Sequence, residues 1–246
     1  MNVVILTGAS RGLGAAMAAR LLSLDCQLIC ISRKPNDALG EMARAKGAAL
    51  DWYLQDLADA DATDELAKSI CSTLPRDASR YVLIHNAASA EPVGRLDTID
   101  AGAFAVATHA NLTAAMIFTA RFLAATKSFD GERRILNISS GLARRPMDSM
   151  AAYCATKAGL DMFTRCINAE AQAAQAPVRA VSLAPGVIDT DMQVGMRAKD
   201  FPESKTFRAM KDEGRLVSPD EVAGKIIAFL ESDDFGATEI DDIRNH

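Results

Sequence analysis

The chain has 246 residues, of which 49% are hydrophobic and 24% are charged, and its formal net charge is −5. This balance is typical of a globular protein with a sizeable core and excludes a disordered chain. Nucleic-acid binding would require clustered lysine and arginine, so we expect no nucleic-acid partner. The doublets Arg133-Arg134 and Arg144-Arg145 are interpreted as solvated ends of elements.

The five cysteines include no CxxC pair, and the three histidines are dispersed. We therefore expect no metal site, and an odd number of thiols fits a reducing compartment. The first apolar run, 3–6, is interrupted by Thr7-Gly8, which argues against a signal peptide. The apolar stretch 112–125 carries Arg121 and is too short to span a bilayer. The sequence thus predicts a soluble cytoplasmic protein without a membrane partner.

Strand and helix patterns alternate along the chain. Short apolar runs predict strands at 3–6, 28–31, 50–54, 81–85, 134–138 and 178–183, with a possible edge strand at 238–240. Helical patterns lie at 13–24, 37–46, 60–74, 97–125, 153–174 and 219–230, and the segment 190–215 is mixed. This alternation predicts βαβ units and an α/β fold, a doubly wound parallel sheet of about seven strands with helices on both faces. Without an internal repeat or a linker, we expect residues 1–246 to form a single Rossmann domain.

A glycine-rich loop, 8–14, follows the first predicted strand and opens the first predicted helix. Its glycines allow the backbone to approach a pyrophosphate, whose charge a helix N-terminus favours. The spacing Gly-x-x-x-Gly-x-Gly differs from the usual dinucleotide fingerprint, and the loop lacks the Lys-Ser/Thr of a Walker motif. The position after a strand and before a helix nevertheless predicts a dinucleotide site.

The residues after the second strand indicate which dinucleotide binds. An acid there would bind the ribose 2′-hydroxyl of NAD, whereas a basic residue accommodates the 2′-phosphate of NADP. This chain has Ser32-Arg33-Lys34 and no acid before Asp37. Arg11 of the glycine loop could face the same phosphate, because guanidinium groups form forked hydrogen bonds with it. The sequence therefore favours NADP(H), and solvated arginines on a turn are the alternative.

Tyr153 and Lys157 are four residues apart in a helical pattern, so they share one helix face. An ammonium beside a phenol favours the phenolate, and we expect the pKa of Tyr153 to be lowered. Ser139 and Ser140 end the strand before this helix and could hold a carbonyl against the phenol. The pattern predicts proton transfer to or from an oxygen.

The glycine loop and the Tyr153-Lys157 pair together resemble the short-chain dehydrogenase/reductase family. The matching segments follow one another in the family's order, at 7–14, 56–57, 86–88, 111, 140, 153–157 and 185–190. One departure is Asn86-Ala87-Ala88, where the family usually has Asn-Ala-Gly. The resemblance implies a Rossmann fold and an oxidoreductase that transfers a hydride between a nicotinamide and a carbonyl.

The resemblance also implies catalytic roles. Tyr153 is the general acid in reduction, and Lys157 lowers its pKa and holds the nicotinamide ribose. Ser140 polarises the carbonyl, whereas its neighbour Ser139 is structural. Asn111 kinks its helix and orders a water that links Lys157 to a proton relay.

The same resemblance implies a cofactor site along the whole cleft. Besides Tyr153 and Lys157, its residues are Gly8, Ser10, Arg11, Gly12, Leu13, Gly14, Ser32, Arg33, Asp56, Leu57, Asn86, Ala87, Ala88, Pro185, Gly186, Val187, Ile188 and Thr190. Asp56 and Leu57 border the adenine, and the segment 185–190 cradles the carboxamide.

A narrower resemblance covers 153–155, 161–163, 189–193, 214–218 and 233–241. These stretches are similar to the sepiapterin reductases and to bacterial relatives that reduce aromatic diketones such as benzil. The similarity implies that an aspartate near the C-terminus, Asp241 or Asp242, contacts the substrate. The alternative is a solvated acidic tail.

The segment 187–215 is expected to form a substrate lid. It supplies Met192 and Met196, and the loop after the serines supplies Leu142, Met147 and Met150. Methionines adapt to varied apolar shapes, which suits bulky or aromatic ketones. Core packing is the alternative for each of these side chains.

The sequence as a whole predicts an NADPH-dependent carbonyl reductase that acts on a small-molecule ketone or diketone. The alternatives are an NAD-dependent alcohol dehydrogenase or 3-oxoacyl reductase of the same family, and a non-catalytic NADP(H)-sensing protein. The resemblance implies a homodimer or homotetramer, with the long helices as the interface.

Overall fold

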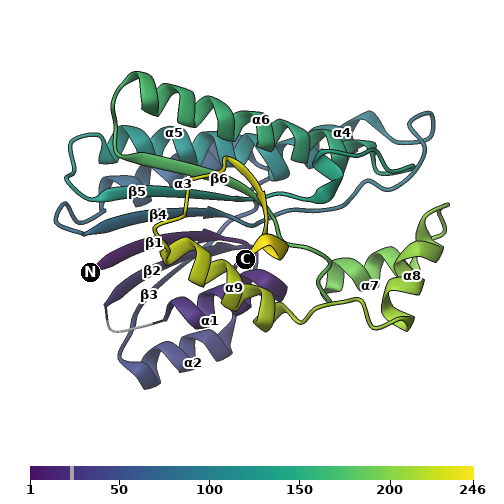
Figure 1. Cartoon of the computed structure of the whole chain (residues 1–246), viewed down its shortest axis with the longest axis horizontal. Coiled ribbons are helices and arrows are strands. Elements are labelled where there is room, and N and C mark those ends of the chain that lie inside the picture. Colours follow the sequence, from purple (N-terminus) through teal and green to yellow (C-terminus); the bar gives the residue numbers. More distant parts are fainter. Residues whose placement is uncertain (23–24) are drawn as a thin grey trace.

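The computed structural model describes residues 1–22 and 25–246, and its centre is one parallel sheet (Figure 1). The strands are β1 (Asn2–Thr7), β2 (Cys26–Ser32), β3 (Ala49–Leu54), β4 (Arg80–His85), β5 (Glu132–Ile138), β6 (Val178–Ala184) and β7 (Ile240–Asp242). They pair in the order β3-β2-β1-β4-β5-β6-β7, and every pair is parallel. The predicted doubly wound sheet is therefore confirmed. Its order reverses between β1 and β4, and ligands bind at such a reversal in open α/β sheets.

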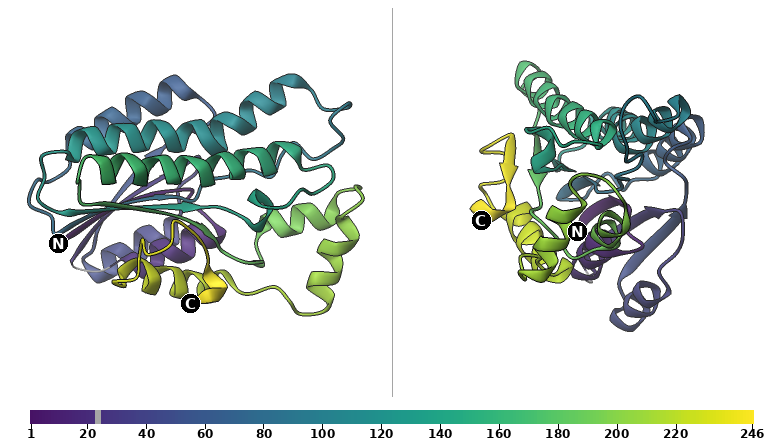
Figure 2. Two further views of the ribbon diagram at one scale, coloured as in Figure 1. Left: turned by 45° about the horizontal axis from the view of Figure 1, so that its top comes forward. Right: turned by 90° about the vertical axis from the view of Figure 1, so that its right-hand side faces the viewer.

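Helices cover both faces of the sheet, as Figures 1 and 2 show. They are α1 (Gly12–Leu21), α2 (Asp37–Lys46), α3 (Ala60–Ser72), α4 (Ala101–Thr108), α5 (Ala114–Thr126), α6 (Ala151–Ala173), α7 (Asp191–Ala198), α8 (Ser204–Asp212) and α9 (Pro219–Glu231). Helices α1, α2 and α9 lie on one face, and α3 to α6 lie on the other. Because strands covered on both faces are apolar on both sides, β1 and β4 are buried almost throughout. Helices α7 and α8 project beyond the carboxyl ends of the strands.

Several predicted boundaries differ from the structure. The helical pattern 97–125 becomes α4, a π-helical turn at His109–Thr113 and α5, which run on without a break. The segment 190–215 forms the two short helices α7 and α8, and the edge strand pairs at 240–242 instead of 238–240. The predicted end of the first helix, at 24, lies outside the described residues.

The continuous tract Ala101–Thr126 is long and apolar enough, by length and composition, to cross a membrane. The prediction that the apolar stretch 112–125 is too short to span a bilayer covered only the second half of this tract. Here the tract packs on α3 and α6 as part of the helical layer. Many core helices of soluble proteins pass the same test.

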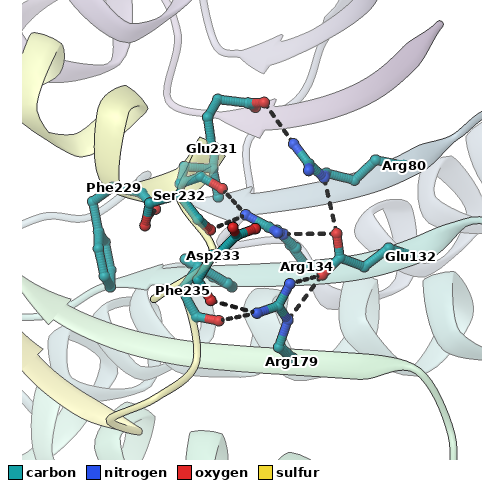
Figure 3. Close-up of polar contacts among 10 residues, drawn as sticks. Arg80, Glu132, Arg134, Arg179, Phe229, Glu231, Ser232, Asp233 and Phe235 are labelled. Atoms are coloured by element: carbon teal, nitrogen blue, oxygen red, sulfur yellow. Dashed lines mark hydrogen bonds and ion pairs between the residues drawn. The ribbon is translucent and has the colours of Figure 1, made fainter.

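The expectation that Arg133 and Arg134 are solvated is wrong, since they are 3% and 1% exposed. Successive residues of a strand point to opposite faces, so each guanidinium reaches a different helical layer from β5. Arg133 donates to the carbonyl of Thr126 at 2.6 Å, at the end of α5. Arg134 donates to the carbonyls of Leu230 and Ser232, at the end of α9 (Figure 3). The doublet therefore ties the C-termini of two helices to the sheet.

Glu132 lies beside Arg134 and receives two further arginines, Arg80 and Arg179, from the neighbouring strands (Figure 3). Burial alone would raise the pKa of Glu132, but hydrogen bonds from Arg134 and Arg179, followed by the other guanidinium charges, lower it to about 2. Phe235 covers this cluster, with its ring centroid 5.3 Å from the Arg134 guanidinium carbon. The cluster joins β4, β5, β6 and the segment after α9 at the amino-terminal side of the sheet.

Candidate functional site

A cavity of about 1200 Å³ opens at the carboxyl ends of the strands. It is lined by the glycine loop, by the ends of β2, β4 and β5, and by Pro185, Ile188 and α7. Nearly all predicted cofactor residues lie in this lining; Gly186 and Val187 do not. Sequence reasoning missed the segment Ser89–Pro92 and the α4 residues Ala103, Val106 and Ala107. No motif marks these residues, because they reach the cavity only through the packing of α4 against α6.

The glycine loop fits a dinucleotide, because side chains are sterically excluded from it. Gly8 has φ of +72°, and a Cβ there would lie 2.8 Å from the Cα of Ala87. A Cβ on Gly14 would lie 2.0 Å from the carbonyl oxygen of Gly8, so the start of α1 packs directly on the loop. Asn86 holds the loop from β4 by donating to the carbonyls of Thr7 and Gly8, each at 3.1 Å. The N-terminus of α1 therefore faces the cavity. A helix N-terminus behind a glycine loop is an arrangement that suits a pyrophosphate.

The segment after β2 forms an ordered basic rim. The Ser32 hydroxyl donates to the Lys34 carbonyl at 2.6 Å and accepts from the Trp52 indole at 3.0 Å. Asn36 caps α2 and also donates to the Ser10 carbonyl at 3.0 Å, which joins this rim to the glycine loop. Arg33 is exposed and lines the cavity. The role of Asn36 was not predicted, although an asparagine before a helix is a recognisable N-cap signal.

Arg11 is positioned differently from the expectation that it faces a phosphate together with Arg33. Its guanidinium pairs with Asp191, the first residue of α7, at 3.0 Å. On the other side of the cavity, Lys199 pairs with Glu91 at 2.9 Å. Both pairs link the α7 segment to the body. Since exposed ion pairs contribute only about 0–1 kcal/mol each, they hold this segment weakly.

Tyr153 lines the cavity, and Ser140 lies beside it but is not among the lining residues. A hydrogen bond from the Ser140 hydroxyl lowers the pKa of the Tyr153 phenol. The Leu142 amide donates to Ser140 Oγ at 3.1 Å, so this oxygen accepts one hydrogen bond while its own proton is directed to the phenol. Ser139, which is among the lining residues, donates to Asp161 at 2.6 Å. The two serines therefore have different partners, and the catalytic role of Ser140 stays a prediction.

The pKa of Tyr153 is the reverse of the expectation. Burial of the phenol raises it to about 12, and the hydrogen bond from Ser140 offsets only part of this effect. Lys157 does not stabilise the phenolate, because its Nζ lies 5.7 Å from the ring centroid and donates to the Ile138 carbonyl at 2.7 Å. The phenol is thus held in its protonated form.

Lys157 is 2% exposed, and burial lowers the pKa of its ammonium to about 8, against the opposing charge of Asp161. It borders a second cavity of about 10 Å³, together with Thr7, His85 and Asn111. This volume suits a single water with polar neighbours. His85 is buried on the other side, and burial followed by the Lys157 charge lowers its pKa to about 3, so it is neutral.

Asn111 lies in the π-helical turn at His109–Thr113, which agrees with the predicted distortion of its helix. Its carboxamide accepts from the Ser89 amide and donates to the Ser89 carbonyl, both at 2.8 Å. It also donates to the Thr156 hydroxyl at 3.3 Å. Asn111 therefore connects the loop after β4 to α6, beside Lys157.

Apolar side chains surround Tyr153 on the side away from the glycine loop. They form one buried cluster, Ala90, Leu142, Met150, Tyr153, Met196, Phe201 and Phe207, with Met147 packed against it. Of the predicted substrate residues, only Met192 and Met196 line the cavity. Leu142, Met147 and Met150 instead support the phenol and the α7–α8 segment from behind.

Asp241 is not in the cavity lining. Its carboxylate accepts from Asn245 and from His246, both at 2.9 Å. Asp242 is bound by Arg244 at 2.6 Å. The carboxylates of Asp241 and Asp242 are therefore bound by the residues that follow them in the chain, and neither is brought to Tyr153.

Comparisons with known proteins match nearly the whole chain. A model described as short chain dehydrogenase matches residues 2–200. Benzil reductase ((S)-benzoin forming) of Bacillus cereus is 38% identical over 244 residues, covering 98% of each chain. Sepiapterin reductase of Mus musculus is 33% identical over 247 residues, covering 95% of this chain and 93% of the other. A solved short-chain dehydrogenase/reductase from Burkholderia vietnamiensis is 31% identical, with a TM-score of 0.68 and coverage of 99% and 97%.

Proposed function

The chain belongs to the short-chain dehydrogenase family, and on this premise we propose that it is an NADPH-dependent reductase of ketones and diketones. It is an oxidoreductase by membership of the family. The observation that supports the finer proposal is the protonated, buried phenol of Tyr153 beside Ser140, at the inner end of a cleft that begins with the glycine loop.

In this mechanism the bound nicotinamide supplies the hydride. When the substrate binds, Ser140 redirects its hydroxyl proton from the phenol oxygen of Tyr153 to the carbonyl oxygen of the substrate and orients that oxygen against Tyr153. Tyr153 delivers its proton to that oxygen as negative charge develops. Lys157 places a positive charge near the Tyr153 ring. It also borders the second cavity, through which the phenol would regain its proton after each turnover. Asn111 holds the loop that closes this region.

The substrate class follows from the apolar wall. Met192 and Met196 line the cavity, and apolar side chains from the α7–α8 segment and from the loop after the serines pack against Tyr153. The two curated relatives reduce, by their names, benzil and sepiapterin. We assign this chain a bulky or aromatic ketone in preference to an acyl thioester.

The direct experiment is a substrate panel of benzil, sepiapterin, isatin, menadione and an acetoacetyl ester, each with NADPH and with NADH. Reduction of the aromatic ketones with NADPH is expected. A preference for NADH would favour the NAD-dependent alternatives, and preference for the acetoacetyl ester would favour a 3-oxoacyl reductase. Tight NADPH binding without turnover would favour a sensing protein.

Cofactor preference is expected to depend on Arg33. The variant Arg33→Asp removes a charge-assisted hydrogen bond to a 2′-phosphate and should raise the KM for NADPH roughly 10- to 100-fold. The KM for NADH should change little. Steady-state kinetics with both cofactors measures this, and Arg44→Asp, an exposed charge reversal on α2 outside the cavity lining, is the control. A wild-type chain that already prefers NADH contradicts the prediction.

The α7–α8 segment is expected to act as a lid, because it lies against the cavity and is joined to the body by two weak ion pairs and a small apolar cluster around Met196. Bound NADPH should slow tryptic cleavage within 195–214 at least about threefold, since ordering a segment reduces its local opening. Mass spectrometry of the fragments over time measures this rate. Cleavage at exposed Lys127 is the internal reference, and equal rates within the lid in both samples would rule the lid out.

The proposed setting is the cytoplasm, with a homodimer or homotetramer as the assembly. Two exposed methionines, Met116 and Met162, lie on α5 and α6 of one helical layer. Exposed apolar side chains on these helices support the proposal of self-association.

A further inference from the structure

Asp161 is a buried carboxylate that the proposed proton delivery does not use. It lies on α6, one turn beyond Lys157 and two turns beyond Tyr153, and it is 7% exposed. Burying an ionised carboxylate costs several kcal/mol unless hydrogen bonds and charges compensate it. Its partners therefore need an explanation.

Both oxygens of Asp161 are fully engaged. Oδ1 accepts from the hydroxyls of Ser139 and Ser182, each at 2.6 Å. Oδ2 accepts from the Arg144 guanidinium at 3.2 Å. These partners come from the end of β5, from β6 and from the loop that precedes α6. The Asp161 carboxylate thus binds three segments of the chain to α6.

Ser140 lies between two of these contacts. Ser139 and Arg144 bracket the short loop 139–144, and both are bound by the same carboxylate. Tyr153 and Asp161 belong to one rigid helix. The distance between the Ser140 hydroxyl and the Tyr153 phenol is therefore determined by how Asp161 holds the loop.

Asp161 also acts on the charge of Lys157. Burial lowers the pKa of Lys157, and the Asp161 charge raises it. The other titratable groups that face Lys157 are Tyr153 on the same helix and neutral His85 on β4. Arg144 lies on the far side of Asp161 and partly compensates its charge.

We propose that Asp161 is a positioning residue, which fixes the Ser140 loop against Tyr153 and places a negative charge one helical turn from the buried ammonium of Lys157. This role rests on the proposed carbonyl reduction. It assigns two functions to one carboxylate, a geometric one through Oδ1 and Oδ2 and an electrostatic one through its charge.

The test is Asp161→Asn, which keeps the shape of the side chain but removes its charge and places a donor or a weaker acceptor toward Arg144. We expect kcat for ketone reduction to fall about 10- to 100-fold. The ratio of kcat at pH 9 to kcat at pH 7 should fall at least about threefold, because Lys157 then loses its proton at lower pH. Cofactor affinity should change less than about threefold, as measured by the fluorescence of Trp52, the single tryptophan, beside Ser32.

Ser182→Ala is the matched control, since it removes one hydrogen bond to the same carboxylate and leaves the charge and the Ser140 loop in place. Its pH ratio should equal that of the wild type. Equal kcat and pH profiles in Asp161→Asn and wild type would overturn the proposal. Identical pH profiles in Asp161→Asn and Ser182→Ala would also overturn it, because they would show that the carboxylate contributes only to packing.

If Asp161→Asn does not fold, Ser139→Ala supplies the answer. It releases one end of the loop while the charge remains. A lower kcat with an unshifted pH ratio supports the geometric function, and an unchanged kcat overturns it. A wild-type chain without turnover on any ketone overturns the proposed function and this role together, whereas an active wild type with an indifferent Asp161 overturns this role only.

Discussion

Replacing Tyr153 by phenylalanine is expected to lower ketone reduction on the order of 10³-fold, which is the usual contribution of a general acid. The ring remains in its apolar cluster, so the packing around it is kept. Only the phenol proton and its hydrogen bond with Ser140 are lost. Because burial raises the pKa of Tyr153 to about 12, the wild-type phenol carries its proton at all pH values at which the protein would work.

Steady-state kinetics with the preferred ketone measures this loss, and Trp52 fluorescence measures cofactor binding, which should be unchanged. Tyr53→Phe is the matched control, because Tyr53 lies on the edge strand β3 and outside the cavity lining. We expect that control to retain full activity. Undiminished reduction by Tyr153→Phe would refute the assignment of Tyr153 as the acid.

Replacing Arg134 by alanine is expected to lower the free energy of unfolding by about 3–5 kcal/mol, the usual cost of breaking a buried ion pair. The guanidinium is 1% exposed and joins Glu132 to the carbonyls of Leu230 and Ser232. Its loss leaves these carbonyls buried without their donor and leaves a space beneath Phe235. For a chain of this size, the melting temperature should fall by about 6–20 °C.

Urea unfolding and thermal melting measure the effect. Arg145→Ala is the control, because Arg145 is exposed and belongs to the other arginine doublet; a change within about 0.5 kcal/mol is expected there. Equal stability of the two variants would contradict the assignment.

The same cluster predicts a pH dependence. The stabilisation from Glu132 is complete above its unfolded pKa, near 4.5, and is lost as pH falls toward its folded pKa of about 2. In Arg134→Ala, which removes a guanidinium that lowers this pKa, the loss should begin near the same pH but be smaller and end at a higher pH, because only the folded pKa is raised.

The fold and most of the residues that line the cavity could be predicted from the sequence. Parallel strands covered on both faces must be continuously apolar, and their connections must be helical. The runs at 3–6 and 81–85 therefore appear as strands β1 and β4. The glycine loop could also be predicted, because a side chain at Gly14 would clash with the backbone of Gly8 in the same loop. A side chain at Gly8 would clash with Ala87, which follows β4.

The sequence alone misplaced the buried charges. Arg134 and Asp161 are charged residues, which usually lie on the surface. Each is buried here because its hydrogen-bond partners come from segments that are distant in the sequence. The pKa of Tyr153 was predicted in the wrong direction for a related reason. Helical spacing places Lys157 one turn away, but it does not show that Lys157 is bound to the Ile138 carbonyl or that the phenol is desolvated.

What the sequence by itself determined is the order of the elements and the identity of the groups at the strand ends, because these depend on local patterns of period two and 3.6. The tertiary structure decided which side chains are removed from water and which of them meet. Burial, charge compensation and the placement of Ser140 against Tyr153 depend on contacts between segments far apart in the chain. A local pattern carries no information about such contacts, since their energies arise only after the strands have assembled.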